Sequence, residues 1–505
     1  MSDRAIRSIA IVGGGSAGWM AASALVKALE NMGVAIRLID SERIGTVGVG
    51  EATLPPIMDF IRQLGIDENE IVREIKATFK LGIAYQDWTR PGDYYFHPFG
   101  PTGFGLGSVS FPAYWLKLFL SGKAERLEEY SVQAAAAAQN KFMRPVHAPN
   151  TPLNKITYAL HFDALLFARY LKHYALARGV MHTEGKVKEV TLRPADGFIQ
   201  SLTLESGEVI EADLYIDCSG FGGLLIEQAL HTGYEDWSRW LPCDRALVVH
   251  SEQAGPPAPY TLVTAREAGW QWRIPLQHRT GNGYVYCSGF AGEAEARETL
   301  LGHLEGRQLT EPVSLAFAPG RRKKAWNKNC VALGLSSGFL EPLEATSIHL
   351  IQRGIAMLLK FFPNRDFETA DIERYNKIFE FELGRVRDFL LMHYANTERA
   401  GAFWDYCRTL PLTDSLKEKI ELFKSYGRIL REDTDLFPVQ SWLSVMIGQA
   451  IVPRSHDPLV DGLDARKIAD KLADIRAKVK QCTETMPTHA EFIAQHCAAG
   501  PVGAA

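Results

Sequence analysis

The first forty residues alternate apolar runs with a glycine cluster in the order of a β-α-β unit. Apolar residues from Ile6 to Val12 predict a buried strand, and the glycine cluster follows it directly. Apolar positions at helical spacing then predict a helix over Trp19 to Leu29. A second strand is predicted over Val34 to Ile39, ending at Asp40. This order is typical of an α/β fold built on a parallel sheet.

The pattern becomes mixed beyond this unit. Glycine, proline and aromatic residues predict loops over Pro91 to Pro112, while Leu160 to Arg178 predicts a helix. Residues Leu262 to Gly289 again favour strands. Short alternating runs predict a small sheet, inserted before the chain returns to the first one: Val187 to Leu192, Phe198 to Leu204 and Leu214 to Asp217.

From Ile348 onward the periodicity is helical. Apolar positions lie near helical spacing in these stretches: Ile348 to Phe362, Ile372 to Tyr394, Thr413 to Leu430 and Leu463 to Gln481. We therefore expect a core over residues 1–360, with loop insertions at about 90–155 and the small sheet. A mainly helical region over residues 361–505 is expected to pack on that core.

Composition and charge exclude several classes of protein. A chain of 505 residues is longer than a single hydrophobic core usually accommodates, so two or more subregions are expected. Its 46% hydrophobic and 23% charged residues are ordinary for a globular protein. A formal net charge of -4 argues against nucleic acid as a partner. No apolar run reaches membrane-spanning length, and the polar start of the chain does not predict a signal peptide. The seven cysteines are scattered without a CxxC pair, which favours reduced thiols in a cytoplasm and offers no metal site.

The glycine cluster satisfies the G-x-G-x-x-G pattern of a dinucleotide site. Gly13 permits the tight turn, Gly15 lets the backbone approach a pyrophosphate, and Gly18 lets helix and strand pack closely. The N-terminus of the helix then presents free N–H groups to the phosphates. Asp40, about 20 residues beyond Gly18, is placed to accept hydrogen bonds from a ribose.

FAD is favoured over NAD because no second fingerprint of this kind follows a later strand. The segment Leu214 to Gly220 ends in a small-residue turn and resembles the second nucleotide-contacting strand of FAD-dependent monooxygenases. Gly48 to Thr53 adds a glycine-rich turn that could close over the flavin. Either turn alone is compatible with an ordinary loop, and together they favour FAD.

Three further stretches resemble the flavin-dependent halogenases of the tryptophan halogenase family. Gly269 to Pro275 contains W-x-W-x-I-P, and Phe79-Lys80 falls in a segment we expect to be helical, where this family carries its catalytic lysine. Gly334 to Leu350 is similar to the family's flavin- and halide-binding stretch. The resemblance runs from Ile6 to about Tyr394 and weakens beyond. It implies an FAD-binding, Rossmann-like domain of the monooxygenase type.

The resemblance implies a reaction of reduced FAD, oxygen and chloride or bromide. Hypohalous acid formed at the flavin passes through a tunnel to Lys80, which holds or activates it by hydrogen bonding or as a haloamine. Glu344 is the second catalytic group, able to stabilise the cationic ring intermediate or accept its proton. Trp270 and Trp272 line the space between flavin and tunnel. Glu341 has no role that we assign beyond the structural one.

The implied ligands are bound by the following residues. FAD contacts are expected at Gly13, Gly15, Ser16, Ala17, Gly18, Asp40, Gly50, Glu51, Ala52, Val187, Leu335 and Ile348. Thr346 and Ser347 precede an apolar helix, so their N–H groups would form the halide site at its N-terminus. A separate flavin reductase is the implied transient partner, and a homodimer is compatible with the sequence.

An indole ring is the implied substrate. His97-Pro98-Phe99 falls where tryptophan halogenases place a histidine and a phenylalanine around the ring, although a packed loop would leave the same pattern. Ala345 and Ser347 depart from the usual serine and glycine of the tryptophan enzymes. Pro438 to His456 contains Trp442 but no tyrosine pair and no glutamate to clamp an amino acid's charged ends. We therefore expect indole or a simple derivative to be preferred over tryptophan.

Two other readings remain open. An FAD-dependent aromatic monooxygenase would share the fingerprint and the strand ending at Asp217, and would oxygenate the ring without halide. A non-catalytic FAD-binding sensor would keep the glycines and have no reason to retain Lys80 and Glu344. A tryptophan halogenase proper is the alternative within the family.

Overall fold

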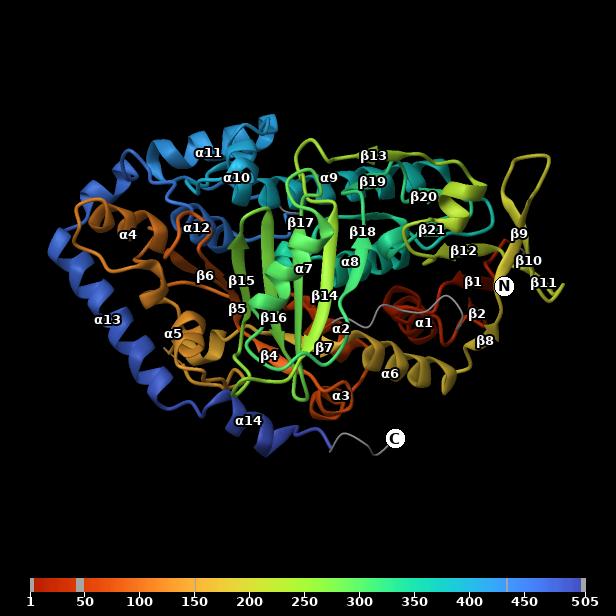
Figure 1. Cartoon of the computed structure of the whole chain (residues 1–505), viewed down its shortest axis with the longest axis horizontal. Helices are drawn as coiled ribbons and strands as arrows, with labels where there is room; N and C mark the ends of the chain where they lie inside the picture. Colours follow the sequence, from red (N-terminus) through yellow and green to blue (C-terminus); the bar gives the residue numbers. More distant parts are fainter. Residues whose placement is uncertain (1–3, 42–49, 150, 433–434, 501–505) are drawn as a thin grey trace. The chain divides into compact units, whose positions relative to one another are not determined.

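The contacts of the chain divide it into two compact units, each assembled from separate segments. The computed structural model describes residues 4–41, 50–149, 151–432 and 435–500 (Figure 1). The first unit comprises Met1–Lys76, Phe162–Ser238 and Phe317–Gly384. The second unit comprises Ala77–His161, Arg239–Ala316 and Arg385–Ala505. This division differs from the one predicted at residue 360, because segments far apart in the sequence alternate between the units.

The first unit is built on a six-stranded sheet in the order β20-β21-β12-β1-β2-β8. Neighbouring strands run parallel from β21 to β8, and β20 is antiparallel to β21. The strands are β1 (Ser8–Val12), β2 (Ala35–Asp40), β8 (Met181–Glu184), β12 (Leu214–Asp217), β20 (Trp326–Asn327) and β21 (Cys330–Ala332). Strands β1 and β12 are almost continuously apolar because parallel sheets are covered on both faces.

Helices pack on this sheet in the first unit. The helix α1 (Ser16–Ala28) contacts both α6 (Ala164–Leu176) and α8 (Ser347–Lys360). A small antiparallel sheet is present as β9 (Val187–Leu192), β10 (Ile199–Leu204) and β11 (Val209–Glu211). Its first two strands match the prediction, but Leu214–Asp217, predicted as the third, is strand β12 of the parallel sheet, because it pairs with β1 and β21. The other elements of this unit are β3 (Gly50–Ala52), α2 (Pro56–Gln63), α3 (Glu68–Glu74), a π-helical turn (Leu224–Ala229), β13 (Tyr234–Asp236), β19 (Gly320–Arg322), a 3-10 turn (Gly334–Ser336), β22 (Gly338–Phe339) and a second 3-10 turn, η6 (Pro342–Glu344).

The second unit contains a seven-stranded sheet in the order β18-β14-β17-β16-β15-β5-β6. All neighbours are antiparallel except β15 and β5, which run parallel. The strands are β5 (Gly82–Gln86), β6 (Tyr94–Pro98), β14 (Arg245–Ser251), β15 (Thr261–Arg266), β16 (Gly269–Pro275), β17 (Thr280–Tyr286) and β18 (Val313–Ala316). In addition, the short strand β4 (Thr78–Lys80) pairs antiparallel with β7 (Ala159–Asp163).

The second unit also holds most of the predicted C-terminal helices. Its helices are α4 (Phe111–Phe119), α5 (Val132–Ala138), α7 (Glu293–Gly302), α10 (Ala402–Arg408), α11 (Asp414–Tyr426), α12 (Val439–Gly448), α13 (Ala465–Glu484) and α14 (His489–His496), with 3-10 turns at Leu127–Tyr130, Pro152–Lys155 and Pro458–Gly462 (Figure 1). The long helix α9 (Thr369–Ala395) contributes its last part to this unit. Among the described residues, no helix is long and apolar enough to cross a membrane.

Three further predictions of secondary structure are wrong. Phe79-Lys80 belongs to strand β4 and not to a helix, because Thr78 and Phe79 are strand formers and the backbone pairs with β7. The predicted loop Pro91 to Pro112 contains strand β6, and α4 begins at Phe111. The predicted helix from Leu160 starts only at Ala164, because Asp163 caps its N-terminus and the preceding residues form β7.

Candidate active site

The glycine turn of the first unit has the geometry that a dinucleotide requires. Gly13 has a φ of 115°, and a Cβ there would overlap the carbonyl oxygen of Cys218. A Cβ at Gly18 would overlap the carbonyl oxygen of Gly13, so helix and turn approach as closely as two backbones can. Gly15, by contrast, has no neighbour within 4 Å of such a Cβ. Gly15 is also the N-cap of α1 and has no side-chain cap, which leaves the N–H groups at Ser16 and Ala17 for a ligand.

The acidic residue at the end of β2 lies directly beside this turn. A Cβ at Gly14 would overlap Oδ2 of Asp40, and Oδ1 of Asp40 accepts a 2.5 Å hydrogen bond from His182 Nε2. Glu184 lies with them, within 4.8 Å between the nearest ligand atoms, so these three could share a metal ion. Asp40 therefore lies beside the glycine turn, at the end of the second strand, as the sequence predicts for a residue that would contact a ribose.

Two loops meet the glycine turn inside the first unit. A Cβ at Gly334 would lie 2.8 Å from Cβ of Ala17, so the loop that carries Leu335 packs on the first turn of α1. The backbone N–H of Leu333 donates to the carbonyl of Asp217 at 2.9 Å, which joins this loop to the end of β12. The structure therefore brings together three of the segments expected to contact FAD.

The carboxylate of Asp217 is fully occupied by its own loop. Its Oδ1 accepts hydrogen bonds from the N–H and the hydroxyl of Ser219, and its Oδ2 accepts from the N–H groups of Leu225 and Ile226 at 2.8 Å. Asp217 thus fixes the turn after β12 and leaves no oxygen for a ligand.

Other residues expected to contact FAD lie on two strands of the first unit, β3 and β9. The start of the glycine-rich turn at Gly48 lies outside the described residues, and Gly50–Ala52 forms β3. Burial raises the pKa of Glu51 to about 7. The side chain of Val187 packs in the apolar core beneath the small sheet.

The helix α8 begins at the residues expected to bind halide. Thr346 is its N-cap and Ser347 its first residue, and the buried hydroxyl of Thr346 has no partner within the described part of the chain. Ile348 is buried in the same turn. Free N–H groups together with an unused buried hydroxyl make this helix start suitable for a small anion.

A strained turn precedes α8. Glu344 is fully buried at the end of η6, and Ala345 has a φ of 56°, a left-handed conformation that costs an alanine energy. Farther along the helix, burial and then the charge of Arg353 lower the pKa of His349 to about 3, so this histidine is neutral.

In the second unit, Lys80 is fully buried on β4. Its Nζ lies 5.2 Å from the centroid of the Phe99 ring. An ammonium over an aromatic face in a site without solvent interacts more strongly than an exposed one. Phe99 in turn has its ring 6.3 Å from the ring of His97.

The predicted substrate residues of the second unit lie in one aromatic cluster. The ring of His97 is 5.8 Å from that of Phe389, and Phe389 packs on Trp442 at 4.8 Å in an edge-to-face arrangement. Phe437 stacks on Phe389, with ring centroids 3.8 Å apart. Phe389 and Phe437 were missed by the sequence analysis: Phe389 looks like an ordinary apolar position of α9, and Phe437 lies in the loop before Pro438.

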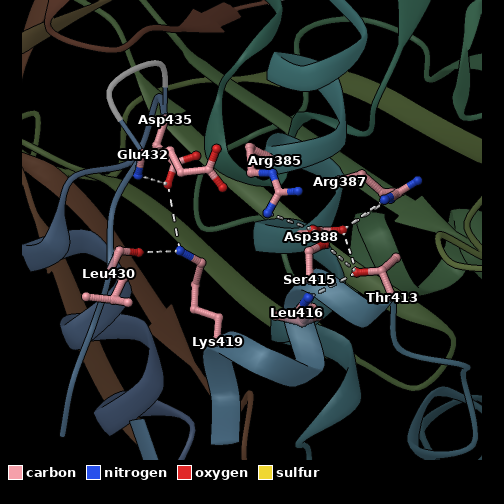
Figure 2. Close-up of polar contacts among 10 residues, drawn as sticks. All are labelled: Arg385, Arg387, Asp388, Thr413, Ser415, Leu416, Lys419, Leu430, Glu432 and Asp435. Atoms are coloured by element: carbon pink, nitrogen blue, oxygen red, sulfur yellow. Dashed lines mark hydrogen bonds and ion pairs between the residues drawn. The ribbon is translucent and has the colours of Figure 1, made fainter. Parts of the chain in front are cut away.

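Buried charged residues lie beside this aromatic cluster. The buried ammonium of Lys419 lies 4.7 Å from the Trp442 ring centroid, donates to the Leu430 carbonyl at 2.7 Å and is 3.7 Å from Asp435. Figure 2 shows this contact beside a second one, in which Asp388 is enclosed by polar groups from α9 and α11. The carboxylate of Asp388 accepts hydrogen bonds from Arg387, Thr413 and Ser415. These ionic groups have partners within the protein.

The tryptophans of the W-x-W-x-I-P motif lie on one face of β16. Two residues apart on a strand, Trp270 and Trp272 point the same way, with ring centroids 5.9 Å apart. Trp272 lies across Gly283 of β17, where any side chain would overlap its ring. Both tryptophans are buried.

The chain is similar to known halogenases over almost its whole length. The family model "Tryptophan halogenase" matches residues 8–465. Tryptophan 6-halogenase ThaL of Streptomyces albogriseolus is 33% identical and aligns with 98% of this chain and 99% of its own. Among solved structures, the flavin-dependent halogenase BrvH from Brevundimonas sp. BAL3 is 46% identical with a TM-score of 0.94, covering 98% of this chain and 99% of its own. Xcc4156, a flavin-dependent halogenase from Xanthomonas campestris, is 44% identical with a TM-score of 0.95 and the same coverage.

The chain therefore belongs to the tryptophan halogenase family. It is a flavin-dependent halogenase, an oxidoreductase that uses reduced flavin, oxygen and halide. The predicted α/β fold, with its inserted sheet and helical C-terminal region, is confirmed.

Proposed function

We propose that this protein halogenates indole or a simple indole derivative, with Lys80 and Glu344 as the catalytic residues. The observation that carries the substrate proposal is the aromatic cluster of the second unit. His97, Phe389 and Trp442 offer flat apolar surface for an indole ring, in the unit that also buries Lys80. Among the described residues beside this cluster, the ammonium of Lys419 and the carboxylate of Asp388 already have partners in the protein, which disfavours a role for them in holding an amino acid's charged ends.

Reduced flavin, when bound, would supply the two electrons that bring oxygen to the peroxide level, at which it oxidises halide to hypohalous acid. The glycine turn, Asp40 and the Gly334 loop are the residues that would hold FAD, because the space above Gly15 is open and the N–H groups of α1 are uncapped. Thr346 and Ser347 would bind the halide through the N-terminus of α8. A separate flavin reductase would deliver the reduced cofactor.

Each catalytic residue is proposed to act through one chemical property. The ammonium of Lys80 donates hydrogen bonds that hold the hypohalous acid and polarise it toward the ring. The buried carboxyl of Glu344, when ionised, stabilises the cationic ring intermediate and accepts the proton that the halogen replaces. Trp270 and Trp272 contribute apolar walls and no chemistry.

The relatives named as tryptophan halogenases support a second candidate, halogenation of free tryptophan. The two candidates are separated by a competition experiment. Equimolar indole and tryptophan are incubated with the protein, FAD, a flavin reductase with NADH, oxygen and bromide, and the products are quantified by mass spectrometry. We expect brominated indole to predominate, and a large preference for tryptophan would contradict the proposal. A hydroxylated ring without bromine would instead support the aromatic monooxygenase.

A further inference from the structure

Two buried side chains, one on the strand that carries Lys80 and one on its partner strand, are joined by a hydrogen bond. Thr78 lies two residues before it on β4, and His161 is the residue opposite Thr78 on β7. Thr78 Oγ1 is 3.1 Å from Nδ1 of His161 and donates to the carbonyl of Pro275 at 2.6 Å. Nε2 of His161 is 2.9 Å from the hydroxyl of Thr261. All of these atoms belong to the second unit.

The direction of these hydrogen bonds follows from the number of protons available. A hydroxyl has one proton, and a carbonyl can only accept, so the proton of Thr78 points at Pro275. The oxygen of Thr78 must then accept from His161, which places the imidazole proton on Nδ1. Nε2 of His161 is left as an acceptor for the hydroxyl of Thr261. The imidazole is therefore fixed in one tautomer and one orientation.

The charge state of His161 agrees with this arrangement. Burial lowers the pKa of His161 well below its usual value, and the positive charge of Lys80 and the neighbouring His489 lower it further. A neutral imidazole keeps Nε2 as an acceptor and adds no second positive charge beside Lys80. The relay from Thr261 through His161 and Thr78 to Pro275 is therefore complete at neutral pH.

The relay adds side-chain support to the N-terminal side of Lys80. Only three residues of β4, Thr78 to Lys80, pair with β7, whereas the chain after Lys80 is held by the hydrogen bond from Leu81 N–H to the Pro259 carbonyl at 2.7 Å and by the paired strand β5. Through Thr78 and His161 the strand is tied to β15 and to Pro275, the last residue of W-x-W-x-I-P. On its backbone side, Phe79 N–H donates to His489 Nε2 at 3.1 Å, and His489 Nδ1 donates to the Pro257 carbonyl at 2.8 Å.

We propose that His161 and Thr78 are positioning residues for Lys80, which they hold where hypohalous acid is passed to the aromatic ring. The proposal rests on the role of Lys80 in the proposed function. Neither residue touches the substrate or the reagent. Without the relay, Lys80 drifts and the acid escapes into solution before it reaches the ring. Hypohalous acid is still formed, but it halogenates compounds in solution in place of the bound aromatic ring.

The experiment measures how the bromine is divided between the substrate and a compound that captures free hypohalous acid. Thr78→Val removes the hydroxyl at nearly constant volume, and the matched variant Thr78→Ser keeps it. Each protein is incubated with FAD, a flavin reductase, NADH, oxygen, bromide, indole and monochlorodimedone, which captures hypohalous acid free in solution. We expect the ratio of brominated indole to brominated monochlorodimedone to fall about tenfold or more in Thr78→Val. In Thr78→Ser the ratio stays within about twofold of the wild type.

A second pair of variants keeps the test valid if Thr78→Val does not fold, which circular dichroism and the affinity for oxidised FAD reveal. His161→Asn retains an N–H close to the position of Nδ1 and is expected to preserve the ratio, whereas His161→Leu lowers it. An unchanged ratio in folded Thr78→Val or His161→Leu overturns the proposal. A failure of the proposed function is recognised separately, because Lys80→Ala would then still brominate indole at the wild-type rate.

Discussion

The glycine turn of the first unit permits a prediction in which neighbouring glycines respond differently. Gly15 has an extended backbone (φ -76°, ψ -172°) that alanine adopts freely, and an added methyl group meets no protein atom within 4 Å. The only cost to the folded chain is a poorer N-cap, so Gly15→Ala should change the free energy of unfolding by no more than about 1 kcal/mol. Gly13 differs, because its φ of 115° and the carbonyl of Cys218 both exclude a side chain. Gly13→Ala should therefore destabilise the protein by about 3–5 kcal/mol.

The same substitutions separate stability from cofactor binding. The methyl group of Gly15→Ala projects into the space where the pyrophosphate approaches the backbone. Losing one charge-assisted hydrogen bond there costs about 1.5–3 kcal/mol, which raises the Kd for FAD roughly 10- to 150-fold. Fluorescence titration of oxidised FAD, together with thermal unfolding of the apoprotein, measures both effects. Wild-type FAD affinity in Gly15→Ala would refute the assignment of this turn to the pyrophosphate.

Three further effects follow from individual side chains. Burial raises the pKa of Glu51 from 4.5 to about 7, so the folded apoprotein binds this proton more tightly than the unfolded chain, and its stability falls as the pH rises from 4.5 to 7. Glu51→Gln should abolish this loss of stability, which amounts to about 1–3 kcal/mol at pH 8 in urea unfolding. An unchanged dependence of stability on pH in Glu51→Gln would contradict the prediction. Thr346→Val removes a buried hydroxyl at the start of α8 that has no partner among the described residues, and it should raise the KM for bromide about tenfold. An unaltered KM would show that the halide does not bind at Thr346. Lys419→Met leaves the carboxylate of Asp435 buried without its cation and should cost about 3–5 kcal/mol in urea unfolding, whereas a neutral result would show that Asp435 is protonated or hydrated.

Much of the first unit was predictable from the sequence because its signals are local. The order strand, glycine turn, helix and strand up to Asp40 is written in consecutive residues, and the structure has β1, α1 and β2 in these places. Two strands of the small sheet, β9 and β10, were also predictable from alternating residues, since a strand covered on one face alternates. Leu214–Asp217 was wrongly placed with them, because the pairing of β12 with β1 is not visible in its own residues.

The surroundings of Lys80 could not be predicted, because they depend on pairing between distant segments. A three-residue strand has no periodicity, and β4 exists through its pairing with β7, about 80 residues later in the chain. The same reason hides Phe389 and Phe437 from the sequence. Their apolar side chains are typical of any buried position, and only the folded chain places them against His97. Thr78 and His161 carry no motif, and their hydrogen bonds appear only when both strands are in register.

The central claim is that Lys80 delivers halogen to an aromatic ring. The most direct measurement is mass spectrometry of indole incubated with the wild-type protein or with Lys80→Ala, in the presence of FAD, a flavin reductase, NADH, oxygen, bromide and an excess of monochlorodimedone, which captures hypohalous acid that is free in solution. The account predicts the bromine isotope pattern in the wild-type product and its loss in Lys80→Ala, with FAD affinity and oxygen consumption retained. Undiminished bromination of indole by a correctly folded Lys80→Ala would contradict it.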